Sequence, residues 1–279
     1  MISSYRGAQM INVFYAGNKK VFDMIMISAY SMAKTASEPI CIYICTMDLS
    51  DENPKYIPIK QEQANFLQNL IQKFNPENRV VLMDVTQIYK THRFDSPNNV
   101  DRFTPYALLR IFADYYDLPE KIIYLDVDTV INNDIAELYN IDIKDYEVGV
   151  VRDVFIFGQQ LKKTYFNSGM MLMNMKKIKE TGYLEKTRQL CQTKKMLFLD
   201  QTALNHAVTF KKMLDRKFNS IHVPHKRYDK VVVHHMCDCR AYLIKRYKSN
   251  NFEMVKKHMP YYKPLIEEIE EIKKESDKL

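Results

Sequence analysis

Short apolar runs alternate with longer stretches of helical period along most of the chain. The apolar runs are rich in β-branched and aromatic residues, a composition typical of buried strands. They lie at residues 10–16, 40–46, 80–85 and 121–127. The intervening stretches gather small and apolar side chains on one helical face. These stretches lie at residues 22–36, 61–74 and 105–115. Strands that alternate with helices predict an α/β fold with a mostly parallel central sheet.

The second half of the chain continues the alternation less regularly. It predicts strands at residues 147–151, 169–175 and 231–233, and helices at 183–191 and 201–210. Near the end, Leu265, Ile266, Ile269 and Ile272 share one face of an amphipathic helix. No internal repeat or low-complexity linker interrupts the sequence. We therefore predict one α/β domain at residues 1–242 and a helical extension at 243–279.

The composition indicates a globular protein and excludes two common kinds of nucleotide-binding site. Hydrophobic residues make up 46% of the chain and charged residues 27%, which is typical of a folded globular protein. The formal charge of +7 weakly favours acidic partners such as nucleotide phosphates. The six glycines form neither the G-x-G-x-x-G of dinucleotide sites nor a P-loop, so another feature must hold the phosphates of any bound nucleotide. We expect no nucleic-acid partner.

The five cysteines are odd in number and show no disulfide framework. The start of the chain lacks the pattern of a signal peptide, and no apolar run reaches the roughly 18 residues of a membrane span. We therefore expect a reducing, cytoplasmic location. The basic and aromatic tail either lies against the inner face of a membrane or covers an edge of the domain.

An acidic pair, Asp126 and Asp128, follows the strongest strand in the chain. Residues two apart on a strand face the same side, and ligands of open α/β sheets bind at the carboxyl ends of the strands. Two adjacent carboxylates repel unless a cation lies between them, and Mn²⁺ or Mg²⁺ suits oxygen ligands. The alternative is that both are solvated loop residues. If the ligand is a nucleotide diphosphate-sugar, such a cation stabilises the departing diphosphate.

The motifs YLDVDTVINNDIAELYN, YFNSGMMLMNMKK, LDQTALNHAV and VVVHHMCDCRAY, in this order, resemble glycosyltransferase family 8. The resemblance covers roughly residues 10 to 242. It implies a single Rossmann-like nucleotide-diphospho-sugar transferase domain of the GT-A type. It also implies Mn²⁺ dependence, with Mg²⁺ as an alternative, a UDP-sugar donor and retention of anomeric configuration.

The resemblance assigns Asp126 and Asp128 to the metal and the nucleotide, and His234 to the metal, with His235 as the neighbour that could be mistaken for it. Cys237 stands where the family has a glycine, so the loop must differ locally. Arg240 takes the place of a lysine that contacts the diphosphate, with a different geometry. The alternative for this histidine and cysteine segment is a structural zinc site, although no second ligand pair stands nearby.

The resemblance also places residues around the donor sugar. Gln201 matches a glutamine beneath the anomeric carbon, where an amide is better suited to stabilising charge than to attacking. Asp200, Asn167 and Arg110 match residues that bind donor-sugar hydroxyls, and Asp153 matches an acceptor-side position. Structural alternatives stay open: Asp200 and Gln201 as a helix cap, Asn167 as a turn residue and Arg110 as a surface helix residue.

The nucleotide loop departs most from the family. Ala16 matches, but Gly17 takes the position of an aspartate that contacts uracil or ribose, and Lys20 that of a stacking tyrosine. Asn18 is the residue available to replace some of the hydrogen bonds. We predict transfer of galactose or glucose from a UDP-sugar to a glycan, lipid or protein acceptor. The alternatives are a catalytically degenerate nucleotide-sugar-binding protein and a nucleotidyltransferase, for which the glycine-rich signature is missing.

Overall fold

The computed structural model describes residues 9–97, 104–153, 164–196, 198–221, 229–237 and 251–276. Its centre is a seven-stranded sheet in the order β3-β2-β1-β4-β7-β6-β8. The strands span Ile11–Ala16 (β1), Ile40–Thr46 (β2), Arg79–Asp84 (β3), Lys121–Leu125 (β4), Val148–Arg152 (β6), Phe166–Asn174 (β7) and Lys211–Met213 (β8). The prediction of an α/β fold is confirmed. The strongest apolar run of the sequence forms β4, the fourth of the seven strands.

Most of this sheet is parallel. β1 pairs in parallel with β2 and β4, β2 with β3, and β6 with β8. β7 is the exception among the described strands of this sheet, because it pairs antiparallel with both β4 and β6. The reversal brings the start of β7 beside the end of β4, where the acidic pair follows.

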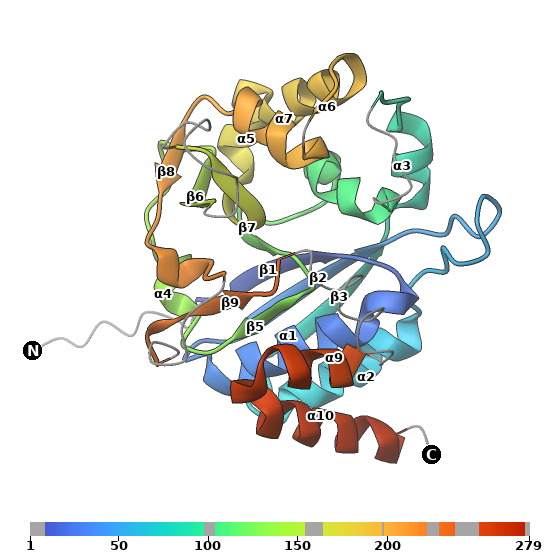
Figure 1. Ribbon diagram of the computed structural model, residues 1–279, viewed down its shortest axis with the longest axis vertical. Helices are drawn as coiled ribbons and strands as arrows, with labels where there is room; N and C mark the ends of the chain where they lie inside the picture. The colour runs from blue at the N-terminus through green and yellow to red at the C-terminus, as the bar shows by residue number, and fades with distance from the viewer. Residues whose placement is uncertain are drawn as a thin grey trace, which may run out of the picture.

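Helices cover both faces of the sheet (Figure 1). One face carries α1 (Phe22–Thr35), α2 (Gln61–Gln72), α9 (Asn251–His258) and α10 (Lys263–Ser276). The other carries η2 (Pro105–Tyr115), α3 (Thr86–His92), α5 (Met175–Thr181), α6 (Tyr183–Thr193) and α7 (Leu199–Ala207). Shorter helices are α4 (Ala136–Tyr139), η1 (Lys19–Val21), η3 (Arg216–Phe218) and η5 (Pro260–Tyr262).

Alternation along the central strands divides the apolar residues between two cores. Ile123 and Leu125 of β4 pack on the side of α1 and α10, whereas Ile122 and Tyr124 pack on the side of η2, α6 and α7. This is the period-two pattern of strands buried on both faces. Asp126, two residues after Tyr124, therefore continues toward the side of η2 and α7.

A second, two-stranded sheet lies next to the acidic pair. β5 (Thr129–Ile131) pairs antiparallel with β9 (Val233–His235), with Thr129 opposite His235 and Val130 opposite His234. The sequence predicted this last strand at 231–233, two residues too early. The strand pairs with β5 and not with the main sheet, so its extent depends on a partner far away in the sequence.

Other element boundaries also need correction. The run 105–115 is helical as predicted, but it is a 3-10 helix. Met175 begins α5, although the pattern placed it at the end of a strand. Apolar character alone does not distinguish a buried strand end from the first turn of a buried helix. α7 begins at Leu199, which is earlier than predicted.

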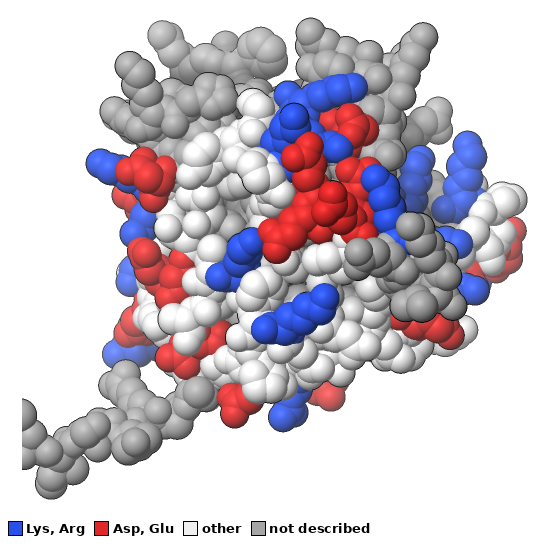
Figure 2. All heavy atoms as spheres, turned by 90° about the horizontal axis from the view of Figure 1, so that it is seen from below, with Lys and Arg blue, Asp and Glu red and all other residues white. Residues whose placement is uncertain are grey.

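The C-terminal helix α10 covers the domain with its apolar face. Ile266 and Ile269 are fully buried, and α10 contacts α1. Glu268 accepts hydrogen bonds from Tyr30 (2.5 Å) and Lys34 (2.7 Å) of α1. From below, the side of α10, acidic and basic side chains lie next to each other and form no single basic field (Figure 2). The helix thus matches the covering alternative.

No helix in the described ranges has the length and apolarity that crossing a membrane requires. The boundary between residues 242 and 243 falls in 238–250, outside the described residues. The division into an α/β domain and a helical extension therefore stays a prediction.

We predict that Ile269→Ala lowers the free energy of unfolding by about 2–5 kcal/mol, because it leaves a cavity between α10 and α1. Glu271→Ala, on the exposed side of the same helix, is the control and should change stability by less than about 0.5 kcal/mol. Urea denaturation followed by circular dichroism measures both. Equal stability of Ile269→Ala and the wild type would show that α10 does not hold to the domain in solution.

Candidate active site

The acidic pair lies in the turn between β4 and β5. The backbone N–H of Asp126 donates to Gly169 O of β7 (2.7 Å), and the Thr129 hydroxyl donates to Asp126 O (3.0 Å). Asp128 is buried and Asp126 is partly exposed. The backbone of Asp126 is therefore held by residues of both sheets, at the carboxyl end of the central strand, where α/β folds bind ligands.

His235 joins the acidic pair. Its Nε2 lies 3.2 Å from Asp128 Oδ1 and 3.8 Å from Asp126 Oδ2. One ligand atom from each of the three residues lies within 4.8 Å of the others, an arrangement that can hold a metal ion. Two carboxylates and an imidazole suit a borderline-hard divalent cation.

The assignment of His234 to this cluster is wrong by one residue. Successive side chains of β9 point to opposite sides, so two adjacent histidines cannot both face the aspartates. The His234 ring instead packs edge-on against Tyr262, with ring centroids 5.7 Å apart. The register Thr129↔His235 places His235 next to the turn that carries the acidic pair.

Gly169 makes room for this cluster. A Cβ at this position would lie 2.8 Å from both Asp126 Oδ2 and His235 Nδ1, and closer still to the His235 ring carbon Cε1. Real Cβ atoms do not approach other atoms so closely. The ring and the carboxylate therefore occupy space that exists because residue 169 has no side chain.

Arg110 joins the acidic pair to the start of α7. Its Nε donates to Asp200 Oδ2 (2.5 Å), and its NH1 donates to Asp126 Oδ1 (2.8 Å) and to the Tyr124 hydroxyl (3.2 Å). Burial by itself lowers the pKa of Arg110, but Asp126 and Asp200 outweigh burial and hold that pKa above its usual value. Arg110 is therefore a buried, charged bridge, which excludes its alternative as a surface residue.

The charges and an unsatisfied nitrogen fit a divalent cation. The guanidinium of Arg110 pairs with the carboxylates of Asp126 and Asp200, and Asp128 lies beside Asp126 and His235. Three carboxylates and one guanidinium leave two negative charges (three minus one) while His235 is neutral. Buried His235 Nε2 makes no hydrogen bond of normal geometry. Burial lowers the pKa of His235, but Asp128 and Asp126 outweigh burial and raise it overall. The surplus negative charge that binds a proton there also suits a metal ion.

Three further predicted site residues form one hydrogen-bonded group. Gln201 Nε2 donates to Asp153 Oδ2 (2.9 Å), and Asn167 Nδ2 reaches Gln201 Oε1 (3.3 Å) and Asp153 Oδ2 (3.4 Å). The backbone N–H of Ser168 also donates to Gln201 Oε1 (3.1 Å). The structure thus brings together Gln201, Asn167 and Asp153, which lie on three separate segments of the chain.

The helix-cap interpretation of Asp200 and Gln201 is wrong. Both residues lie inside the first turn of α7, whose N-cap is Phe198. The helix opens at Leu199 with φ 41°, a left-handed conformation that a bulky residue rarely adopts. Such strain is often found at functional sites, and here it immediately precedes Asp200 and Gln201.

The nucleotide loop lies against the acidic turn. Ala16 ends β1, and a Cβ at Gly17 would lie 3.9 Å from Val127 and only 2.5 Å from Val21. An aspartate at position 17 would therefore require Val21 to move. Asn18 is largely buried, and its Oδ1 accepts from the backbone of Lys20 at the start of η1. The close approach of Val21, the last residue of η1, leaves no room for a side chain at position 17 in this conformation.

Arg240 lies outside the described residues, so its contact with the diphosphate stays a prediction. Cys237, which stands at the family's glycine, has φ 51° and so adopts the left-handed backbone that glycine favours. Its Sγ lies 3.7 Å from Asn167 Nδ2, next to the Gln201 group. The family alignment that pairs His234 with the metal-binding histidine therefore places Cys237 correctly at a glycine-like backbone. The imidazole near the aspartates nevertheless belongs to His235.

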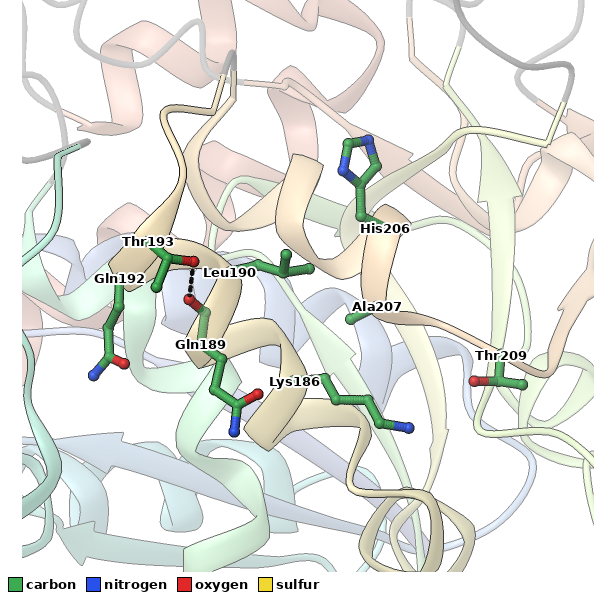
Figure 3. Close-up of a pocket in the computed structure, with 8 residues that line it drawn as sticks. All are labelled: Lys186, Gln189, Leu190, Gln192, Thr193, His206, Ala207 and Thr209. Carbon is green, nitrogen blue, oxygen red and sulfur yellow. Dashed lines mark hydrogen bonds between the residues drawn. The ribbon is translucent and has the colours of Figure 1, made fainter.

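A shallow hollow of about 640 Å³ lies between α6 and α7 (Figure 3). Lys186, Gln189 and Thr193 line it from α6, and His206 and Thr209 line it from the end of α7 and beyond. Gln201, by contrast, stands at the start of α7. The rise of about 1.5 Å per residue separates Gln201 from His206 by roughly 8 Å along the helix. None of the residues that line this hollow belongs to the candidate site.

The sequence matches the model of a known protein family. The model of the family "Glycosyl transferase family 8" matches residues 12–238, which include the acidic turn, Gln201 and His235. The chain belongs to this glycosyltransferase family.

Relatives of this chain carry related names. A Haemophilus influenzae protein provisionally named a glycosyltransferase is 27% identical over 235 residues, covering 76% of this chain and 64% of that protein. The lipopolysaccharide 1,2-glucosyltransferase of Escherichia coli is 27% identical over 135 residues, covering 40% and 39%. The chain thus spans less than two thirds of the length of these curated relatives.

The fold is also that of a solved glycosyltransferase. The galactosyltransferase LgtC, in complex with donor and acceptor sugar analogues, superposes with a TM-score of 0.60. The match covers 85% of this chain and 94% of LgtC at 18% identity. At this identity the likeness shows the fold, and the prediction of a single GT-A-type domain is confirmed.

Sequence patterns did not identify several residues of the site. Tyr124 donates to Asp126 Oδ1 (2.6 Å), and its place two residues earlier on the same strand was the signal available. Gly169 was also recognisable in principle, because a glycine within a strand often marks a position where another group packs closely against the backbone. Asn219, whose Oδ1 lies 3.0 Å from His235 Nδ1, has no local signal.

We predict that Gly169→Ala lowers the free energy of unfolding by about 1–3 kcal/mol, because the new methyl group displaces His235 and Asp126. Gly149→Ala in β6 is the matched control. Its Cβ would lie 3.1 Å from the mobile end of Leu214 and at least 3.4 Å from other atoms, so the loss should be smaller. Chemical denaturation of both variants measures the difference. A Gly169→Ala protein as stable as Gly149→Ala would contradict the close packing described for His235.

Proposed function

We propose that this family 8 member is a metal-dependent, retaining hexosyltransferase that moves galactose or glucose from a UDP-sugar to the hydroxyl group of an acceptor. The observation that carries the proposal is that Arg110 joins two groups of side chains. One is the Asp126–Asp128–His235 cluster, suited to a cation. The other, at the start of α7, consists of Asp200 and the Gln201 amide, suited to a sugar.

Asp126, Asp128 and His235 are the residues that would hold Mn²⁺, or Mg²⁺ as the alternative. When bound, the cation supplies positive charge that stabilises the diphosphate leaving group. Arg110 orients Asp126 by binding one of its oxygens, so that Oδ2 faces His235. Such outer contacts fix a ligand before the metal arrives and reduce the cost of binding.

In the proposed reaction, the acceptor oxygen forms a bond to the anomeric carbon while the bond from that carbon to the diphosphate oxygen breaks. The bonding pair leaves with UDP, and the acceptor proton passes to the departing phosphate oxygen. Positive charge develops on the sugar ring, and we assign its stabilisation to the amide of Gln201. Asp200 and Asn167 would bind sugar hydroxyls, and Asp153 would face the acceptor.

The contacts of Gln201 favour a stabilising role over a nucleophilic one. Its Oε1 already accepts from the Ser168 backbone and the Asn167 amide, so little lone-pair density is left to attack carbon. An amide oxygen is also a weak nucleophile. We therefore favour attack by the acceptor from the face that the diphosphate leaves. Retention of configuration itself rests on the family.

Names of related proteins support a hexose donor. LgtC is named a galactosyltransferase, and the Escherichia coli relative a glucosyltransferase. We place the reaction in the cytoplasm, where thiols stay reduced, and no disulfide joins the described cysteines. Because α10 packs its apolar residues on α1, a peripheral membrane contact through this helix would depend on its charged face. Glycans, lipids and proteins all remain candidate acceptors.

Calorimetric titration with UDP, with and without Mn²⁺, tests the donor class, and GDP and ADP serve as controls. We expect UDP to bind more tightly than either control and to require the metal. Slow Mn²⁺-dependent hydrolysis of UDP-galactose or UDP-glucose should follow. Absence of nucleotide binding under every condition would favour the degenerate binding-protein alternative, in which the altered loop at Gly17 has lost the donor.

We predict that Asp128→Asn abolishes metal-dependent donor hydrolysis, by about 10²-fold or more, without unfolding the protein. Asp128 is the cleaner target because Asp126 also neutralises Arg110. The control is Asp142→Asn. Asp142 is exposed and belongs to neither group of site residues, so this variant should retain wild-type activity. Circular dichroism and Mn²⁺ titration accompany the rate measurement. Near-normal turnover of Asp128→Asn would remove this residue from the metal site.

We predict that Gln201→Ala lowers turnover by roughly 10²-fold while UDP affinity stays within about threefold of wild type, since the amide acts on the sugar and not on the nucleotide. Gln192→Ala on exposed α6 is the control and should change neither quantity. Donor hydrolysis and calorimetry measure the two effects separately. Loss of UDP binding in Gln201→Ala would make this residue structural.

A further inference from the structure

Asn219 lies between the metal cluster and the Gln201 group. It caps the end of η3 and is almost fully buried. Its Oδ1 lies 3.0 Å from His235 Nδ1, and its Nδ2 donates to Asn167 Oδ1 (2.9 Å). A buried amide with partners on both sides has a defined orientation. Here the orientation of the Asn219 amide decides which ring nitrogen of His235 carries the proton.

A backbone donor fixes the orientation of both amides. The N–H of Gly169 can only donate, and it lies 3.0 Å from Asn167 Oδ1, so that atom is the carbonyl oxygen. The Asn219 group that faces the same oxygen must then also be a donor, which is its NH₂. The carbonyl oxygen of Asn219 consequently faces His235.

The oxygen of Asn219 can only accept, so His235 Nδ1 must carry a proton. Nε2 is then the nitrogen whose lone pair is available when the ring is neutral, and it is the atom that faces Asp126 and Asp128. Metal-bound histidines commonly donate their second ring N–H to a carbonyl or carboxylate oxygen, which sets the tautomer and the ring orientation.

We propose that Asn219 is a positioning residue that keeps His235 in the Nδ1–H tautomer and thereby presents Nε2 to a divalent cation. The inference rests on the proposed function for the metal, but the tautomer itself does not. The chain of contacts from the Gly169 N–H through Asn167 and Asn219 to His235 makes the choice of tautomer depend on Asn167, which does not touch the ring.

The same chain links the two halves of the site. Asn167 also contacts Gln201 and Asp153 through its Nδ2. A movement of the Asn167 amide would therefore disturb both His235 and Gln201. Metal binding and the arrangement of the sugar-facing amides are coupled through two asparagines.

Long-range ¹H–¹⁵N correlation spectra of the imidazole rings test the tautomer in the metal-free protein, at a pH where His235 is neutral. The chain has seven histidines, and His235→Gln identifies the signal. We expect the Nδ1–H pattern in the wild type. Asn219→Ala and Asn167→Ala should both lose it, giving a mixture or the Nε2–H pattern. The control is Ser220→Ala. Ser220 follows Asn219 in the chain, but its hydroxyl donates to Arg216 O and not to His235, so this variant should keep the Nδ1–H pattern.

Electron paramagnetic resonance of free Mn²⁺ gives the metal affinity of the same proteins. We expect Asn219→Ala to weaken Mn²⁺ binding about tenfold or more, as for other outer partners of metal-binding histidines. Asn219→Asp keeps an acceptor for His235 but loses the donor to Asn167. It should retain the Nδ1–H tautomer and most of the affinity, which a merely space-filling role of Asn219 would not predict.

The two proposals fail in different ways. A wild-type Nδ1–H signal that persists in both Asn219→Ala and Asn167→Ala, or an Nε2–H signal in the wild type, would overturn the role of Asn219. If Asn219→Ala does not fold, Asn167→Ala and Asn219→Asp decide the question. A correct tautomer in a protein that binds no Mn²⁺ would instead count against the proposed metal dependence.

Discussion

The buried guanidinium of Arg110 is the interaction on which the geometry of the site depends. It binds Asp126 at the end of the central strand and Asp200 at the start of α7, and it is itself almost inaccessible to solvent. Removing one partner of a buried charge pair typically costs about 3–5 kcal/mol, because the other charge is left uncompensated. The end of the central strand and the helix that carries Gln201 are therefore held at a fixed separation.

The reversed strand β7 supplies the second constraint. Because it runs antiparallel to β4, its first residues lie beside the acidic turn, whereas a parallel strand would have placed its last residues there. Gly169 then accepts from the Asp126 backbone and leaves space for the His235 ring. One short segment, 166–169, thus contributes a backbone anchor, an empty volume and the Asn167 amide. A rigid strand is well suited to holding such a set, since functional sites on regular elements are the most precisely positioned.

The amides connect these parts into a continuous network. From His235 through Asn219 and Asn167 to Gln201, the backbone N–H groups of Gly169 and Ser168 define which atom is donor and which is acceptor. A network whose orientations are set by the backbone does not need to reorganise when a substrate arrives. This is the property that makes electrostatic stabilisation effective in enzymes.

The sequence by itself determined the elements whose signals are local. The apolar runs located β1, β2 and β4, and the acidic pair after the strongest run marked the site, because burial and alternation depend on neighbouring residues. The motif resemblance gave the family. Tertiary structure alone decided which of two adjacent histidines faces the aspartates, since the pairing of β9 with a distant strand sets that register. It also decided the direction of β7 and the role of Asn219, because both depend on contacts between segments whose proximity no local pattern encodes.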